Sequence, residues 1–491
     1  MDGSATAIPP ELSNFFELPG PQSLLIRGPP GSGKTTLALA LLDAFPGQRF
    51  YITGRVRDSD LLRAFPWLGV TRSRQNWNLL DLASSPRSAS EAARLSSLIS
   101  ESVPEGTGDG QRQRLWLPGA IQEVWARRNR TAPTMMVLDS WNAFTELYLG
   151  LGGSLPVGAP SREDLERYLL DLVGTENVHT VLVLEGEAQT QLDYLVDGVA
   201  TTQVERPDGH RERWLSFPKL RGVRIETDEY PFTLDGSRFR AFPRTQPTEL
   251  VPQAPEAERP RTKGAVWPGS SDFVAAFGRL PFDALTLIEL DPGVPRQVHR
   301  AILFPIMSDV MRRGGRVLLV PPPTLDPQDT FDRLSQMIPL RDLKRRLRVL
   351  GLVENAALMK DHREIFVSTP LPRGPIFPTN PDGKGPPDLL VTYLSGIEAL
   401  MAASGGGARL GRALIPGMAR MVFGPKNIHM IAVGRGDDSS FQELTVVAGV
   451  HIGVHDRRGR IVLSGKRPFT PEYVLERSRD ARTPYELTRL V

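Results

Sequence analysis

The stretch LLIRGPPGSGKTT at residues 24–36 constrains the fold more than any other part of the sequence. A short apolar run, typical of a buried strand, leads into a glycine-rich turn, and Lys34 opens a segment with helical spacing. The turn matches the pattern G-x-x-x-x-G-K-[ST] in full. Its glycines let backbone N–H groups face inward, and a helix that begins there presents its positive end to an anion. The sequence therefore predicts a strand–loop–helix unit that holds the phosphates of a nucleotide.

Two kinds of side chain complete this predicted site. Lys34 is expected to neutralise the β and γ phosphates, and Thr35 to offer its hydroxyl to Mg²⁺. Asp139 ends the apolar run MMVLD, where it is expected to reach the metal through water or else to cap the helix that follows. We expect ATP and Mg²⁺ as cofactors. The predicted nucleotide contacts from the loop are Gly28, Pro29, Pro30, Gly31, Ser32, Gly33, Lys34, Thr35 and Thr36.

Length and composition set the broad class of protein. A chain of 491 residues suggests about two to four domains. The 59 Lys and Arg residues against 56 Asp and Glu leave a net charge of only +3, so no global field demands a nucleic acid or a membrane as partner. Without cysteine, disulfides and thiolate metal sites are excluded. We find no signal-peptide pattern and no run of about 20 apolar residues, so we expect a cytoplasmic protein without membrane insertion.

The N-terminal half alternates two kinds of segment. Short unbroken apolar runs are typical of strands buried on both faces, and longer stretches between them have helical spacing. The alternation predicts an α/β fold in which a parallel-rich sheet is flanked by helices. The apolar runs lie at 23–26, 49–53, 134–138 and 180–184, and the helical stretches include 36–44 and 161–173.

A proline-rich segment divides the chain into two halves of similar length. Residues 243–268 contain six prolines and no apolar periodicity, which is typical of a semi-rigid linker. We therefore predict a first domain at residues 1–245, a linker at 246–270 and a second domain at 271–491.

The second half contains a faint copy of the phosphate loop. When residues 26–41 are laid over 288–303 without a gap, Lys34 falls on Arg296. This favours a duplicated domain, although an unrelated second α/β domain remains the alternative. Leu290, Pro295 and Gln297 replace Gly28, Gly33 and Thr35. Because a leucine side chain and a proline without an N–H cannot form a ring of donors, we expect a degenerate second domain without a functional phosphate loop.

The stretches GPPGSGKTT, MMVLDS and KLRGVRIETDEYPFTLDGSRFRAF together resemble the KaiC/RadA branch of the RecA superfamily. The resemblance covers residues 20–245 and implies two RecA-like P-loop NTPase domains, the C-terminal one degenerate. The chain is similar in outline to doubled archaeal relatives such as the gas-vesicle regulator GvpD. The resemblance also implies that Lys219 and Arg221, in the K-x-R-G turn, bind nucleotide across a subunit interface in a homo-oligomer. Surface charges on a hairpin are the alternative.

One departure from that family bears on catalysis. In its hydrolytic members, the strand after the first helix ends in one or two glutamates that position water, whereas Gly54 and Arg55 stand there in this chain. Loss of such a group lowers the rate by roughly 10²–10⁴-fold. We therefore expect Mg-ATP at subunit interfaces to control assembly or partner binding, with slow or absent hydrolysis. The alternative is an active ATPase, a motor or a switch, that uses Lys34 with a displaced acid such as Glu185.

Two further segments bear on partners. Residues 340–350, LRDLKRRLRVL, are predicted to form an amphipathic helix whose basic stripe binds DNA phosphates, an acidic partner or an anionic surface, or is simply solvated. The loop at 150–161 has no Lys, Arg or aromatic residue, which argues against binding of single-stranded DNA. The sequence does not exclude a protein partner, and it gives only weak support for the binding of a nucleic acid.

Overall fold

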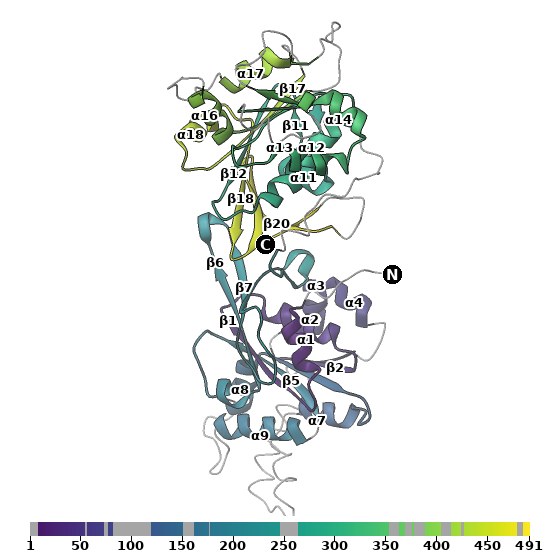
Figure 1. Ribbon diagram of the computed structural model, residues 1–491. Helices are drawn as coiled ribbons and strands as arrows, with labels where there is room; N and C mark the ends of the chain where they lie inside the picture. Colours follow the sequence, from purple (N-terminus) through teal and green to yellow (C-terminus); the bar gives the residue numbers. More distant parts are fainter. Residues whose placement is uncertain are drawn as a thin grey trace, which may run out of the picture. The chain divides into compact units, whose positions relative to one another are not determined.

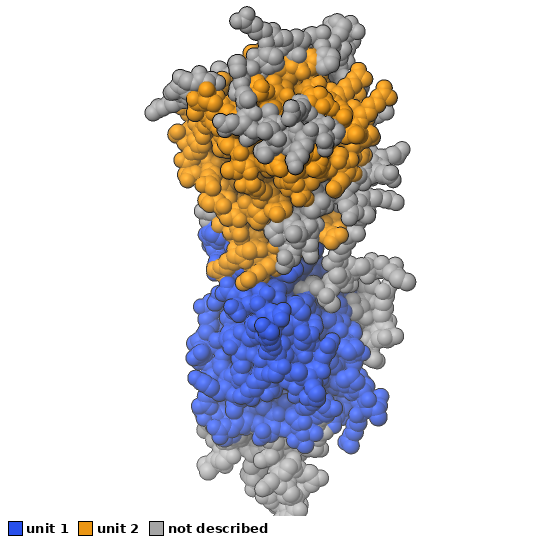
Figure 2. All heavy atoms as spheres, in the orientation of Figure 1, with its two compact units in different colours: residues 1–243, 490–491 blue, residues 244–489 orange. Residues whose placement is uncertain are grey.

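Two units make up the chain, and each is built around one large β-sheet. The first comprises residues 1–243 with 490–491, and the second residues 244–489 (Figure 2). Within the described residues, no helix combines the length and the apolar character needed to cross a membrane. The computed structural model describes residues 8–54, 56–72, 77–81, 119–150, 162–175, 177–245, 264–352, 363–368, 376–377, 388–403, 414–423, 427–478 and 485–491.

The sheet of the first unit has the strand order β3-β2-β4-β5-β1-β6-β7-β8-β9 (Figure 1). Pairing is parallel from β3 to β6 and antiparallel from β6 to β9. The strands are β1 Ser23–Gly28, β2 Gln48–Thr53, β3 Trp77–Asp81, β4 Thr134–Asp139, β5 Val178–Glu185, β6 Gly198–Glu205, β7 Glu212–Leu220, β8 Glu229–Thr233 and β9 Arg240–Ala241. The four predicted strands and the α/β class are confirmed.

Helices cover both faces of this sheet because its central strands are apolar on both sides. Leu24 and Ile26 of β1 belong to a core cluster that includes buried residues of α1, α2, α3 and α4, whereas Leu25 belongs to a second cluster with residues of α7, α8 and α9. Burial of each such side chain contributes roughly 1.5–3 kcal/mol. The helices are α1 Pro10–Phe16, α2 Lys34–Ala44, α3 Asp58–Ala64, α4 Pro66–Arg72, α7 Gly119–Arg127, α8 Trp141–Gly150, α9 Arg162–Thr175 and α10 Leu192–Leu195, with 3₁₀ turns η1 Pro207–Gly209 and η2 Asp235–Ser237.

The sheet of the second unit has the order β15-β14-β13-β16-β17-β12-β18-β19-β20-β21. Its strands are β12 Leu285–Leu290, β13 Val317–Val320, β14 Leu347–Gly351, β15 Phe366–Ser368, β16 Asp388–Tyr393, β17 Ile428–Gly434, β18 Val450–Arg457, β19 Arg460–Arg467, β20 Phe469–Glu476 and β21 Glu486–Arg489. Its helices are α11 Ser271–Phe277, α12 Arg296–Arg312, α13 Pro327–Ser335, α14 Leu340–Arg346, α16 Leu394–Ala403, α17 Leu414–Phe423 and α18 Ser439–Thr445, with the 3₁₀ turn η4 Arg363–Ile365.

The two sheets share one topology. When β15 is left out and the strands of each large sheet are counted along the chain, both sheets run 3-2-4-5-1-6-7-8-9; β15 is an additional strand beyond β14 in the second unit. Ile26 pairs with Val183 and Ile288 with Val433, so these positions are equivalent. In both units the helix that follows the first strand of the large sheet begins six residues after that strand ends: α2 begins at residue 34 after β1 ends at 28, and α12 begins at 296 after β12 ends at 290. The common topology favours a duplicated domain over an unrelated one.

The predicted helix over residues 340–350 is wrong in its second half. The helix α14 ends before Leu347, and β14 begins there. Leu347 and Val349 are fully buried and pair with β13, because sheet pairing and burial outweigh the helical spacing of the leucines. Lys344, a member of the predicted basic stripe, forms an ion pair with Glu364 at 3.1 Å.

The predicted linker is described only at its end. Residues 246–263 lie outside the described residues, as do 151–161 of the loop that argued against DNA binding. Within the predicted linker, Ala265–Val266 form β10, which pairs in antiparallel fashion with β11, Leu280–Pro281. The two strands of this small sheet flank α11, with β10 before the helix and β11 after it.

Candidate nucleotide-binding site

The phosphate loop adopts a conformation that its glycines make accessible. Gly31 and Gly33 have φ angles of 71° and 103°, in the left-handed region that side chains rarely adopt. At Gly28, an added Cβ would lie 2.2 Å from the carbonyl oxygen of Thr202, so only glycine fits there. Ser32 is buried, and its Oγ lies 2.6 Å from Oγ1 of Thr202. The loop is thus fixed against β6 and opens at the N-terminus of α2.

Lys34 lies folded over this loop. Its Nζ donates to the carbonyl oxygens of Gly28 and Pro29, both at 2.8 Å. Burial lowers the pKa of Lys34, while the carboxylates of Glu185 and Asp139 act in the opposite direction. A buried ammonium group held only by two carbonyls is suited to a phosphate.

Asp139 and Thr35 meet at the predicted metal position. Oγ1 of Thr35 donates to Oδ2 of Asp139 at 2.7 Å, and the hydroxyl of Tyr51 donates to the same oxygen at 2.6 Å. Burial raises the pKa of Asp139, and the hydrogen bonds from Tyr51 and Thr35 oppose that rise. A hydroxyl beside a carboxylate provides the hard oxygen ligands that Mg²⁺ prefers, so these residues fit the ion. Sequence reasoning missed Tyr51, although a tyrosine within a buried strand usually finds a hydrogen-bond partner.

The end of β2 has the departure that the sequence predicted. The N–H of Gly54 donates to the carbonyl oxygen of Asp139 at 2.9 Å, so Gly54 lies beside the metal position. Arg55 lies outside the described residues. The first carboxylates after β2 are Asp58 and Asp60, in the first turn of α3. No carboxylate therefore follows β2 directly among the residues that the structure describes.

Glu185 lies at the same edge of the sheet as the loop. It ends β5 and is paired in register with Gly28 of β1. Its N–H donates to Oδ1 of Asn142 at 3.0 Å, and its charge raises the pKa values of both Lys34 and Asp139. The predicted acid is thus near the site, on a different strand from the one that the hydrolytic relatives use.

Lys219 and Arg221 lie at the opposite edge of the sheet. Lys219 is paired with Val199, at the amino end of β6, whereas the loop follows the carboxyl end of β1. Nζ of Lys219 donates to the carbonyl of Val196 at 2.5 Å, and Arg221 forms an ion pair with Asp197 at 3.4 Å. The fold does not bring these two cations to the phosphate loop of their own chain.

One arginine that sequence reasoning missed contacts that loop, and a second follows two residues later. Nη2 of Arg211 donates to the carbonyl of Gly31 at 3.2 Å. Arg213 is 6% exposed, and its Nε and Nη1 have no hydrogen-bond partner within the described part of the chain. Burial, together with the neighbouring Arg211, lowers the pKa of Arg213 to about 10. The alternating basic residues of RERW, at the start of β7, were the available signal, since side chains two residues apart in an extended segment lie on the same side.

The pairing register of the strands identifies the residue of the second unit that corresponds to each site residue of the first. Val183 pairs with Asp139, and Val433 pairs with Tyr393, so Tyr393 takes the place of Asp139. Two residues beyond Val183 and Val433 stand Glu185 and Arg435. The second unit therefore lacks both acids of the first. In full, Gly28, Gly33, Lys34, Thr35, Asp139 and Glu185 correspond to Leu290, Pro295, Arg296, Gln297, Tyr393 and Arg435.

Comparison with known proteins agrees with this site. Residues 115–217 match the family model of the GvpD gas vesicle protein, P-loop domain. The chain is 28% identical over 329 residues to the protein GvpD1 and 28% identical over 340 residues to GvpD2, both of Halobacterium salinarum. These matches cover 64% and 67% of this chain and 56% and 64% of the two relatives, so the chain spans less than two thirds of their length. A solved structure, the KaiC-like protein PH0186 of Pyrococcus horikoshii, is 18% identical at a TM-score of 0.33, over 46% of this chain and 92% of that one.

The fold and the loop define a P-loop protein of the nucleotide-binding type. Within that class the chain resembles the GvpD proteins. The family match begins before β4 and ends within β7, so it includes Asp139, Glu185 and Arg211 but not the phosphate loop at residues 28–36.

Proposed function

We propose that the first unit binds Mg-ATP, and that the bound nucleotide controls assembly or partner binding while hydrolysis is slow or absent. One observation carries the proposal: the parts that bind phosphate and metal are complete, while Gly54 stands beside Asp139 where a water-positioning carboxylate is expected. A site with every binding group and no base in the usual place is suited to holding its ligand.

The residues of the first unit divide the binding between them. Lys34 and the free N–H groups at the N-terminus of α2 hold the phosphates. Thr35 and Asp139 hold Mg²⁺, which when bound neutralises phosphate charge. Arg211 adds a positive charge on the β7 side of the loop.

The second unit, in this proposal, binds no ATP. Domains at 1–245 and 271–491, joined by the segment 246–270, then contain one nucleotide site per chain. Leu290 and Pro295 replace two glycines of the loop, which removes a backbone donor and adds side-chain bulk. The second unit would act as a structural or regulatory partner of the first.

The proposed control of assembly depends on the edge positions of Lys219 and Arg221. Because they lie opposite the loop of their own chain, they reach a nucleotide only when the edge of one copy faces the loop of another. Such a head-to-tail contact is heterologous, and it closes into a ring when the rotation permits. ATP would then stabilise the assembly by binding the shared site better than the lone chain.

The alternative function is an active ATPase, and the position of Glu185 favours it. The carboxylate acts electrostatically on both Lys34 and Asp139, so an acid is present near the reacting end of the nucleotide. A displaced base of this kind would support turnover at ordinary rates, about 1–10³ per second.

Two measurements on one sample decide between these functions. Titration calorimetry with Mg-ATP is expected to give a stoichiometry near one per chain. A steady-state ATPase assay is expected to give turnover well below about 1 per second. Turnover of about 10 per second that is lost in Glu185→Gln would establish the alternative. The absence of any binding would refute both.

A further inference from the structure

A cavity of about 600 Å³ lies in the second unit, independent of the ATP site proposed for the first. It is lined by residues at or just beyond the carboxyl ends of four parallel strands: Leu290 of β12, Pro322 after β13, Tyr393 of β16 and Gly434 of β17. Open α/β sheets bind their ligands at this edge, where the strand order reverses. The volume is within the range of small-molecule sites.

The charged residues at this cavity differ from those at the corresponding positions of the first unit. Tyr393 stands where Asp139 would hold a metal, and Gln297 replaces the hydroxyl of Thr35. Arg435 stands where Glu185 adds a negative charge. Replacing two acids by a phenol and a guanidinium removes the metal site and leaves a position suited to an anion without one.

Several hydrogen-bonding groups at the cavity are unused. Nε2 of His299 and Nε of Arg300 are buried and have no hydrogen-bond partner among the residues that the structure describes. The second nitrogen arm of Arg300 binds Asp329, which leaves Nε with nothing to bind. Nη1 of Arg296 donates to the carbonyl of Thr324 at 2.9 Å, so this arginine is positioned at the rim. Buried donors without partners are costly, and a ligand that accepts from them would remove that cost.

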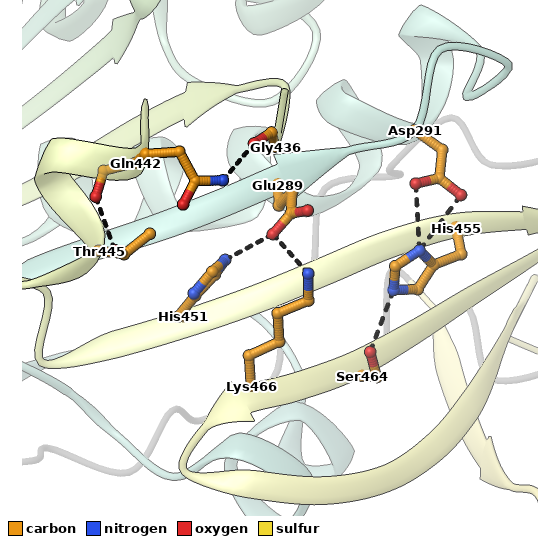
Figure 3. Close-up of polar contacts among 9 residues, drawn as sticks. All are labelled: Glu289, Asp291, Gly436, Gln442, Thr445, His451, His455, Ser464 and Lys466. Carbon is orange, nitrogen blue, oxygen red and sulfur yellow. Dashed lines mark hydrogen bonds and ion pairs between the residues drawn. The ribbon is translucent and has the colours of Figure 1, made fainter. Parts of the chain in front are cut away.

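Two of the acidic residues that line the cavity are engaged elsewhere. Both oxygens of Asp291 lie 3.2 Å from Nδ1 of His455, whose Nε2 contacts Ser464 (Figure 3). The connectivity is that of a nucleophile triad, but Ser464 is only 4% exposed, so it meets no substrate. Asp438 accepts from the N–H of Ser440 and caps α18. Among the described residues, Asp291, Asp438 and the third acidic lining residue, Asp437, form no ion pair with the arginines of the cavity.

Much of the remaining lining is apolar. Leu303, Phe304 and Met307 contribute from α12, and Leu319 from β13, and all four are buried. An anion with no apolar part would leave this lining unfilled. The lining therefore selects for a ligand with both an anionic head and an apolar body.

We propose that the second unit binds a small organic anion, a carboxylate or phosphate monoester on an apolar body, without a metal ion. Arg296, Arg300 and Arg435 contact the head group, and the α12 side chains contact the body. Through this site a metabolite of that class would regulate a chain whose ATP site lies in the other unit.

The test uses the full chain in EDTA and four probes: phenyl phosphate, benzoate, phenol and inorganic phosphate. Titration calorimetry is expected to give one site per chain for phenyl phosphate or benzoate, and the better of the two identifies the head group. Phenol, which lacks the charge, and inorganic phosphate, which lacks the body, are expected to bind at least tenfold more weakly. Lys34→Ala, which disables the proposed ATP site, is expected to leave this binding unchanged.

A matched pair of variants locates the site. Arg300 and Arg333 both pair with Asp329, but only Arg300 lines the cavity. Arg300→Gln is expected to weaken binding by about tenfold to a hundredfold, the range for a charge-assisted hydrogen bond, whereas Arg333→Gln retains it. Arg435→Gln, at an exposed position, is the second variant if Arg300→Gln does not fold. The proposal is overturned if no anion binds at millimolar concentration, if these variants bind like the wild type, or if Lys34→Ala abolishes binding.

Discussion

The two units share a sheet topology and the same spacing between the first strand of the sheet and the helix that follows it. They differ in the side chains at the ends of the neighbouring strands. β1 and β12 are equally buried through their apolar residues, and both lead into a helix after the same number of residues. The side chains at these strand ends are different: Tyr393 of the second unit takes the position of Asp139, and Arg435 takes the position of Glu185. The apolar strands determine the fold and the strand ends determine the ligand, so a fold can persist where its original site is lost.

A second difference shows how the scaffold accommodates such changes. Arg27 of β1 corresponds to Glu289 of β12, one residue before the strand ends. Arg27 forms an ion pair with Asp193 at 2.5 Å, whereas Glu289 accepts from His451 and Lys466, both at 2.8 Å (Figure 3). The hydrogen bond from His451 lowers the pKa of Glu289 to about 2. A charge in the sheet is thus tolerated in either sign when a partner of opposite sign lies beside it.

The largest expected effect separates the two loops. Lys34→Ala is expected to abolish Mg-ATP binding, because it removes the buried cation from a site that is otherwise complete. Arg296→Ala, at the corresponding position, is expected to leave ATP affinity and a stoichiometry near one unchanged. Titration calorimetry measures both. Unaltered affinity in Lys34→Ala, or a wild-type stoichiometry near two, would contradict the difference between the units.

The next prediction concerns rate. Gly54→Glu with Arg55→Glu places carboxylates after β2, beside Asp139, where hydrolytic relatives have them. We expect ATP turnover to rise by roughly 10²–10⁴-fold, the usual contribution of such a base. A steady-state assay on both proteins measures the change. If the wild type is already fast, the carboxylate of Glu185 is the base and the additional acids will matter little.

The sequence predicted the loop and the strands of the first unit because both have short-range signals. A glycine pattern and an unbroken apolar run are visible within a dozen residues. Tyr51 was missed because its contact with Asp139 comes from pairing between strands that are distant in the sequence, which no local pattern reports. The helical interpretation of residues 340–350 was wrong for the same reason, since burial of Val349 against β13 decides its structure. The cavity in the second unit was likewise hidden, because β12, β13, β16 and β17 meet only in the folded sheet.

Tyr51 offers a smaller effect within the first unit. Tyr51→Phe removes one of the two hydrogen bonds to Oδ2 of Asp139. Loss of such an orienting partner is expected to weaken Mg²⁺-dependent nucleotide binding by about 10–100-fold. Tyr230→Phe is the matched control, because Tyr230 donates to the carboxylate of Glu11 at 2.8 Å in the same unit. Equal affinities in the two variants would show that Asp139 does not serve the metal.

Two buried histidines at equivalent positions are expected to make the stability of both units depend on pH. His179 and His429 lie four residues before Val183 and Val433, on β5 and β17. Burial lowers the pKa of His179, and burial lowers the pKa of His429 to about 4, despite its bond to a backbone carbonyl. Each ring therefore stays neutral in the folded chain at a pH where the unfolded chain takes up a proton.

This difference makes stability depend on pH with a defined sign. Between pH 6.5 and about 4 the unfolded state binds more protons at His429, so the free energy of unfolding falls as the pH falls through that window. The full contribution is present above pH 6.5. One proton corresponds to about 1.4 kcal/mol, or tenfold in the folding equilibrium, per pH unit. Urea unfolding at pH 7 and pH 5.5 is expected to show a smaller loss in His429→Asn than in the wild type, and an identical loss would contradict the assignment.

The smallest expected effect concerns assembly, and the comparison of the units selects the residue to test. Lys219 corresponds to Arg467, since they pair with Val199 and His451 at equivalent places. Both cations donate to backbone carbonyls around the end of a short helix, Lys219 at α10 and Arg467 at α18. This structural role is common to both units. The loss of Lys219 would therefore destabilise the fold whether or not Lys219 contacts a nucleotide.

Arg221 has no such counterpart, because Phe469 stands in its place in the second unit. Its side chain is 57% exposed and its ion pair with Asp197 is long, at 3.4 Å, so its removal costs the isolated chain little. If Arg221 binds the nucleotide of a neighbouring copy, Arg221→Ala weakens ATP-dependent assembly by about fivefold at unchanged thermal stability. Phe469→Ala is the matched variant, expected to leave the ATP dependence as it is. Light scattering with and without Mg-ATP measures the mass of each. A wild-type mass that does not respond to ATP would remove the basis for action between copies, and a response retained in Arg221→Ala would move that action to another residue.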